Sequence, residues 1–190
     1  LATDLQQASL IGIGSPRASV EANFALMEWV GKKNFYAGVS QQELQALQCV
    51  LDILGTNPAT TPTLKEIERA DAVLILGEDV LNTAPRLALA IRQANRNKAK
   101  AMAATAHIRS WDAIAVQNNA RHVRSPLYIL TTHPTGLDEL AEKIHTDVLQ
   151  NMARLGFAIA HKIDATAPAV ADLTAAETAL VEEIAAVLLQ

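Results

Sequence analysis

The sequence predicts an α/β fold, namely an open, mostly parallel, doubly wound sheet with helices on both faces in a Rossmann-like, three-layer arrangement. Half of the 190 residues are hydrophobic but only 4% are aromatic, so the core is aliphatic. Short apolar runs of strand length alternate with segments of helical periodicity, and that alternation is typical of parallel sheets. The length suits one domain, and we expect residues 1–190 to form it.

The first third of the chain has clear signals for the starts of helices. Ser19, Ser40 and Thr63 are hydroxyl residues that can cap a helix, and Glu43 and Glu66 complete capping boxes with the last two. The predicted elements are strands at residues 10–14 and 35–36, helices at 20–31, 40–54 and 63–70, and a loop at 55–62.

The rest of the chain continues the alternation. Thr83 is predicted to cap a helix with Pro85 in its first turn, Pro126 leads into a strand, and Thr174 with Glu177 forms a capping box. The predicted elements are strands at residues 72–77, 99–104 and 127–130 and helices at 84–96, 136–145, 147–162 and 174–189.

The two ends and the single cysteine add further expectations. The chain begins with Leu1 and stops after a helix that a further strand would normally follow, so we expect a piece of a longer protein. One cysteine excludes a disulfide within the chain and a cysteine-based zinc or iron–sulfur site. Cys49 lies between apolar residues of a predicted helix, which favours a core thiol. The sequence has neither a signal peptide nor a run of the ~18 apolar residues that span a bilayer.

The net charge of −4 is unevenly distributed. Residues 1–85 carry −5 and residues 125–190 carry −6, whereas residues 86–124 carry eight bases and one acid. This basic stretch could face an acidic neighbour, a phosphate or nucleic acid, or its bases could simply complement the carboxyl ends of helices. Nucleic acid is disfavoured because the bases are not interleaved with stacking aromatic residues, apart from the single Trp111.

Two turns after predicted strands are candidate ligand sites. The first begins like a dinucleotide fingerprint, with Gly12 and Gly14, but Arg17 stands where the third glycine belongs. Its backbone amides could hold an anion near Ser15 and Arg17, or the turn could be a plain connection.

The second turn, Gly77-Glu78-Asp79, follows the predicted strand at 72–77, where open α/β sheets bind ligands. Its two acids could hold a ribose or a metal, although they would repel a diphosphate, or they could be solvated turn residues. No histidine pair has the helical spacing of metal ligands, and no catalytic set is evident. The sequence therefore assigns no catalytic, metal or cofactor residue; Ser15, Arg17, Gly77, Glu78 and Asp79 are the positions to consider for a ligand.

Several segments, in order, make the chain resemble the large iron–sulfur subunit of bacterial NADH-quinone oxidoreductase, which is the G subunit of respiratory complex I. The segments are residues 11–21, 23–26, 71–80, 84–86, 91–94, 153–161 and 166–170. The resemblance extends over essentially the whole chain. It implies an α/β domain similar to molybdopterin oxidoreductases, downstream of iron–sulfur clusters whose cysteines precede Leu1. It further implies a place in the peripheral arm, on the cytoplasmic face of the inner membrane and without direct membrane insertion, among the other subunits.

The chain departs from the molybdopterin relatives at two positions. Where they show Gly-x-Asn-Pro, this chain has Gly77, Glu78, Asp79 and Val80, and an acid there repels a diphosphate. Where they place a cysteine, selenocysteine or serine metal ligand, only Ser40 is available, and we interpret it as a helix cap.

These departures favour a cofactor-free scaffold domain of the large iron–sulfur subunit, without chemistry of its own. The alternative is a pterin- or nucleotide-binding domain of a molybdopterin-type oxidoreductase. If the domain is a scaffold, the basic stretch 86–124 is an interface candidate, and reversing Arg121 and Arg124 to Glu is expected to weaken assembly.

Overall fold

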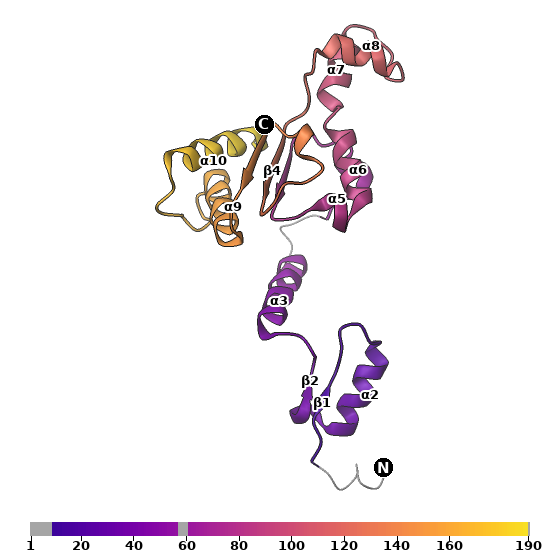
Figure 1. Ribbon diagram of the computed structural model, residues 1–190, viewed down its shortest axis with the longest axis vertical. Coiled ribbons are helices and arrows are strands. Elements are labelled where there is room, and N and C mark those ends of the chain that lie inside the picture. The colour runs from indigo at the N-terminus through magenta and orange to yellow at the C-terminus, as the bar shows by residue number, and fades with distance from the viewer. Residues whose placement is uncertain (1–8, 57–60, 190) are drawn as a thin grey trace. The chain divides into compact units, whose positions relative to one another are not determined.

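The structure is a computed structural model that describes residues 9–56 and 61–189 (Figure 1). The chain divides into two compact units, Leu1–Thr61 and Pro62–Gln190, and each is described by itself. The prediction of a single domain over residues 1–190 stays a prediction.

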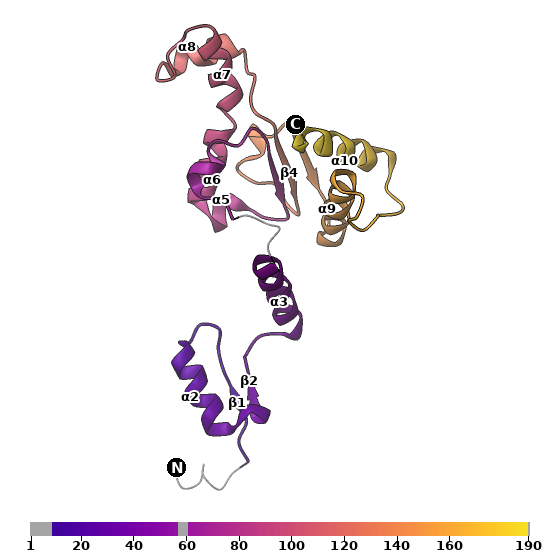
Figure 2. The ribbon, with the colours of Figure 1, turned by 180° about the vertical axis from the view of Figure 1, so that it is seen from behind.

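The first unit is built on a small β–α–β arrangement, visible from both sides in Figures 1 and 2. Two short strands pair in parallel, with Gly12 opposite Phe35 and Ile13 opposite Tyr36. Its elements are β1 (Gly12–Ile13), α2 (Val20–Val30), the 3-10 helix η1 (Lys32–Asn34), β2 (Phe35–Tyr36) and α3 (Gln41–Thr56). The predicted strands at 10–14 and 35–36 and helices at 20–31 and 40–54 are therefore confirmed.

The second unit contains a three-stranded parallel sheet in the order β3 (Val73–Leu76), β4 (Leu127–Thr131), β5 (Lys143–Thr146). All five residues of β4 are buried, because this strand is central and covered on both faces. Ile129 of β4 lies opposite Ile75 on one side and Ile144 on the other. The predicted strands at 72–77 and 127–130 are confirmed.

Helices cover both faces of this sheet (Figures 1 and 2). On one face Tyr128 and Leu130 pack with the buried side chains of α9 (Leu149–Ile163) and α10 (Ala175–Leu188). On the other face Ile75 and Ile129 pack with α5 (Val80–Thr83) and α6 (Pro85–Ala94). The layers are thus helix, sheet and helix, which confirms the predicted α/β class.

Local signals place the starts of several helices correctly. The capping boxes at Thr63 and Thr174 both form, at the starts of α4 (Leu64–Ile67) and α10. Pro85 occupies the first turn of α6, as predicted. Thr83, however, does not cap that helix. Its hydroxyl donates to Glu78 and to the Asp79 carbonyl instead, and Ala84 is the cap residue.

Three predicted segments are corrected by the structure. Residues 99–104 lie in the helix α7 (Asn97–Thr105) and not in a strand, as the high helix propensity of alanine explains. The segment 136–145 is not a helix: it holds the 3-10 helix η2 (Asp138–Leu140) and the start of β5, which pairs with β4. In the predicted loop at 55–62, residues 55–56 belong to α3, and residues 57–60 lie outside the described residues.

The helix α8 (Ala113–Ala120) is not among the predicted elements. It packs against α7 as the second arm of a helical hairpin, through Ala99, Ala103, Val116 and Ala120 (Figure 1). The hairpin is joined to the sheet by Asn95, which is buried and donates to the Ser125 carbonyl at 2.8 Å.

Candidate functional site

The backbone of the turn at Ser15, the first candidate site, is occupied by the chain itself. The Ser15 amide donates to Oδ1 of Asn23 at 3.0 Å, and Nδ2 of Asn23 donates to the Ser15 carbonyl at 2.9 Å. The Arg17 amide donates to the Ser15 hydroxyl, and the Ala18 amide to the Ser15 carbonyl. An anion would therefore have to displace these internal bonds.

The adjacent amino end of α2 is also capped from within. Ser19 accepts from the Ala22 amide at 3.2 Å, as the sequence predicts. The pKa of Glu21 is lowered, because its carboxylate accepts from its own backbone N–H and from the Ser19 hydroxyl. A carboxylate thus sits where a phosphate would bind, at the positive end of the helix dipole.

The two glycines of the Gly12-x-Gly14 motif allow neighbouring side chains to pack closely against the backbone of β1 and the turn after it. A Cβ on Gly12 would lie 2.8 Å from Val30 and 3.1 Å from Leu26, and one on Gly14 would lie 2.5 Å from Asn23 Oδ1. Close contact between helix and strand is therefore supplied at Gly12, although Arg17 occupies the position of the third glycine.

The second candidate turn lies at the carboxyl end of β3. Gly77 adopts a positive φ of 78°, which glycine tolerates, and its amide donates to the Leu130 carbonyl at 2.7 Å. Asp79 caps α5: Oδ1 accepts from the Leu81 amide at 3.2 Å, and Oδ2 accepts from Asn82 Nδ2 at 2.6 Å. Both oxygens of this carboxylate are thus committed to the start of the helix.

The structure adds a neighbour that the sequence analysis missed. His133, just after β4, places Nε2 at 3.6 Å from Asp79 Oδ2. The sequence could have indicated His133 as a neighbour of Asp79, because both residues follow strands predicted for the same parallel sheet. The hydrogen bond from Asn82 is the main cause of the lowered pKa of Asp79, with smaller help from His133, so the carboxylate is ionised at neutral pH.

A second carboxylate, Asp147, follows the end of β5. It accepts from Asn151 Nδ2 at 2.9 Å and from the Val148 amide at 2.7 Å, and these two bonds, the first above all, lower its pKa. His145 Nε2 lies 3.7 Å from Asp147 Oδ2 and has no hydrogen-bond partner in the described part of the chain. Among residues 9–56 and 61–189, no three histidine, cysteine or acidic side chains gather as metal ligands would.

These residues do not fit the phosphates of a pterin nucleotide. The amides at Ser15, Arg17 and Gly77 donate within the chain, and the carboxylates of Glu78 and Asp79 stand at the strand end. Two negative groups would repel a diphosphate, and no lysine or arginine of the described residues forms an ion pair with them. Ser40 caps α3 through its box with Glu43.

The structure places Cys49 differently from the sequence prediction. Its thiol is exposed on α3, so the prediction of a core thiol is wrong. The reason is that the apolar face of α3 is not buried: Leu47, Val50 and Leu51 are each about half exposed.

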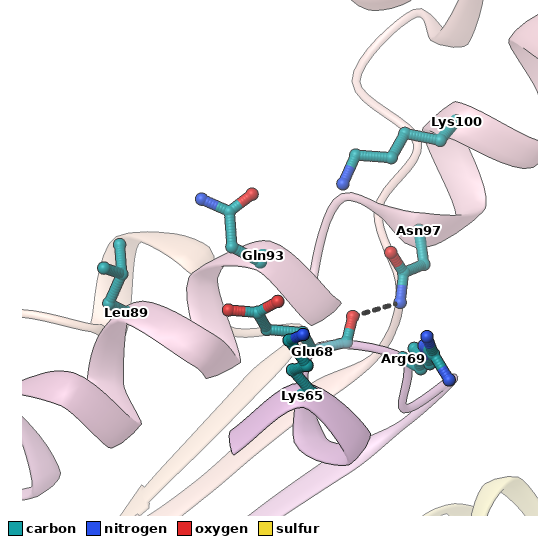
Figure 3. Close-up of a pocket in the computed structure, with 7 residues that line it drawn as sticks. All are labelled: Lys65, Glu68, Arg69, Leu89, Gln93, Asn97 and Lys100. Carbon is teal, nitrogen blue, oxygen red and sulfur yellow. Dashed lines mark hydrogen bonds between the residues drawn. The ribbon is translucent and has the colours of Figure 1, made fainter. Parts of the chain in front are cut away.

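The basic stretch 86–124 builds a different kind of surface, on α6, α7, α8 and their connections. None of its eight bases forms an ion pair within the described residues, whereas Lys143 and Lys162 pair with Glu183 and Glu182. Two hollows lie along this stretch. The first, of about 470 Å³, is bordered by residues of α4, α6 and α7 together with the turn after α4 (Figure 3).

Figure 3 shows how the first hollow is organised. The side chain of Glu68 lies beside Lys65, on the side of the hollow where Gln93 stands, and its backbone carbonyl accepts from Asn97 Nδ2 at 2.8 Å. Because it contains an acid as well as bases, this hollow has a mixed charge.

The second hollow, hereafter the basic groove, has a volume of about 380 Å³. It lies between α6, the α7–α8 hairpin and the Glu139–Leu140 segment. Its cationic rim consists of Arg92, Arg96, Lys100 and Arg124, with His122 beside them and one acid, Glu139.

Comparisons with known proteins agree on one class of relatives. No protein-family model matches the chain. The chain is 49% identical over 168 residues to the G subunit of NADH-quinone oxidoreductase from Yersinia pestis, covering 88% of this chain and 18% of that protein. It is 48% identical over 165 residues to the protein of the same name from Escherichia coli strain K12, and this match covers 87% of this chain and 18% of that protein. It is 43% identical over 185 residues to the protein of the same name from Pseudomonas fluorescens, and this match covers 97% of this chain and 20% of that protein.

The resemblance stated from the sequence is thereby confirmed. The chain is a homologue of a segment of these NADH-quinone oxidoreductase G subunits. It spans about a fifth of the length of these relatives. Within the described residues, no helix has the length and apolar character required to cross a membrane.

Proposed function

We propose that the chain is a non-catalytic scaffold segment of the G subunit, within the complex that passes electrons from NADH to quinone and couples this to proton translocation. In this proposal it carries no cofactor of its own. It supports iron–sulfur clusters held elsewhere in the same protein and contacts neighbouring subunits. Its place is the peripheral arm, on the cytoplasmic side of the inner membrane.

The proposal is supported mainly by the two candidate ligand turns, whose polar groups bond within the chain itself or present acids to a ligand. In a binding domain of this architecture the amides after the strands point at the ligand. Here Asn23 and the Ser15 hydroxyl engage the first turn, and the second presents Glu78 with Asp79. The names of the relatives support the assignment to the complex.

The test neutralises the strand-end acids in the complete complex, as the double variant Glu78→Gln, Asp79→Asn. The matched control is Glu142→Gln, which removes an exposed carboxylate at the opposite, amino end of β5. For both, we expect the turnover of NADH with quinone, per assembled complex, to stay within twofold of the parent. The denatured parent complex should release no pterin, as measured by fluorescence and mass spectrometry.

Two results would overturn the scaffold proposal. One is a tenfold loss of turnover per assembled complex in the double variant but not in Glu142→Gln. The other is a pterin or nucleotide released by the parent complex and missing from the double variant, which would establish the binding-domain alternative.

A further inference from the structure

The cations of the basic groove have no carboxylate partner in the described residues. Arg92, Arg96, Lys100 and Arg124 line it, and none of them takes part in an ion pair there. Among the described residues of the lining Glu139 is the only acid, so the groove has a net charge of +3 when His122 is counted as neutral. Four cations this close together repel one another, and a negatively charged occupant would relieve that repulsion.

Two of the arginines are held in place by their own chain. Nη2 of Arg92 donates to the Gly136 carbonyl at 3.3 Å, and Nη1 of Arg124 donates to the Glu139 carbonyl at 2.9 Å. A guanidinium has five N–H donors, so each arginine keeps donors for a further acceptor. Because these side chains are already ordered, an occupant that bonds to them loses less conformational entropy on binding.

The apolar part of the groove lining, called its floor below, consists of alanine, valine and leucine side chains. Ala99, Val116 and Ala120 are buried in the hairpin core, and Val123 and Leu140 are half-buried beside them. A groove with an apolar floor and a cationic rim complements a segment that carries an apolar side chain flanked by carboxylates.

We propose that the basic groove binds an acidic polypeptide segment of a neighbouring subunit, with one apolar side chain on the floor and its carboxylates against Arg96, Lys100, Arg92 and Arg124. This rests on the proposed function, which makes the chain a scaffold among other subunits. A polypeptide is favoured over nucleic acid because no phenylalanine, tyrosine or tryptophan is among the described residues that line the groove, and the whole chain is acidic.

The test reverses the two cations that make no side-chain hydrogen bond within the described residues, as Arg96→Glu with Lys100→Glu in the complete complex. The matched control is Arg86→Glu with Arg109→Glu, an equal charge change on the same basic stretch but outside both hollows. Arg124 is avoided because its reversal would also break its bond to the Glu139 carbonyl. The conservative pair Arg96→Lys, Lys100→Arg keeps the charge.

The first readout is the fraction of the large iron–sulfur subunit that co-purifies with the rest of the complex. Relative to the parent at the same salt, the groove reversal should lower it at least fivefold, more strongly in 50 mM than in 300 mM salt because salt screens charge interactions, while the control and the conservative pair stay within twofold. A photo-crosslinking residue at Gln117, in the groove lining, should attach to an acidic peptide of one other protein of the complex. Reversing the acids of that peptide to lysine should restore co-purification with the groove variant.

The outcomes separate the two proposals. Normal co-purification of the groove variant with unchanged turnover per complex, or crosslinks to nucleic acid or to peptides without acidic residues, would refute the groove proposal and leave the scaffold function standing. Normal assembly with a tenfold lower turnover per complex would refute the scaffold function, because a groove variant would then act on the chemistry.

Discussion

At the scale of single residues, polar side chains in this protein mostly bond to their own backbone. Asn23 holds the turn at Ser15, Asp79 holds the start of α5, and Asn95 fastens the hairpin to the entry of β4. Such bonds pair backbone groups of these turns within the chain itself. Polar residues that suggest a ligand site in the sequence therefore stabilise turns and helix starts in the structure.

Tyr128 provides a test at this scale. Burial, assisted by the hydrogen bond from its hydroxyl to Glu183, raises its pKa to about 12 from the usual 10. Since the folded-state pKa is the higher one, its contribution to stability is complete below pH 10 and is lost as the pH rises from 10 to 12.

The measurement is a spectrophotometric titration of the variant Tyr36→Phe, which leaves Tyr128 as the remaining tyrosine. Tyrosinate absorbance should develop near pH 12, together with or after the loss of circular dichroism. Half-ionisation near pH 10 with the dichroism intact would show that Tyr128 is not buried as described.

At the scale of elements, capping decides where helices begin, and packing decides which faces are buried. The helix α10 shows both effects. Thr174 accepts from the Glu177 amide at 3.2 Å, and Glu177 accepts from the Thr174 amide at 2.7 Å. The buried side chains Val181 and Ile184 pack this helix against the sheet face that contains Tyr128.

The substitution Thr174→Ala should lower the free energy of unfolding by about 1 kcal/mol, the usual cost of losing a cap. Thr174→Ser keeps the hydroxyl and should stay within about 0.5 kcal/mol of the parent. Chemical denaturation monitored by circular dichroism measures both. Equal losses for Ala and Ser would mean that the threonine methyl group, and not the cap, matters.

At the scale of the whole molecule, many ionised carboxylates stabilise the fold in the same way, by accepting hydrogen bonds at helix starts and turns. Acids at helix starts and turns have lowered pKa values because they accept hydrogen bonds in the folded state; they are Glu21, Glu43, Glu66, Asp79, Asp147, Asp164 and Glu177. A lowered folded-state pKa contributes stability above the unfolded value and loses it as the pH falls through the folded one.

The chain should therefore lose thermal stability on acidification below about pH 4.5, the upper of the ordinary carboxyl values. The melting temperature, followed by circular dichroism, should be nearly constant from pH 7 to 5 and then fall from pH 4.5 to 3. A melting temperature that is the same at pH 5 and pH 3 would contradict this shared role of the acids.

The sequence by itself determined what depends on neighbours along the chain. Apolar runs placed β3 and β4, hydroxyl and acid pairs placed the starts of α3, α4 and α10, and the acids after β3 already argued against a diphosphate. These signals are local, because a cap acts over three residues and a buried strand needs only a short apolar run.

Only the tertiary structure decided what depends on distant partners. The strand β5 exists because β4 pairs with it, although its own residues, Lys143–Thr146, form no apolar run. The basic groove likewise joins Arg92 to the Gly136 carbonyl and Arg124 to that of Glu139. Sequence spacing carries no information about such contacts, since the folded core, and not the local chain, brings these groups together.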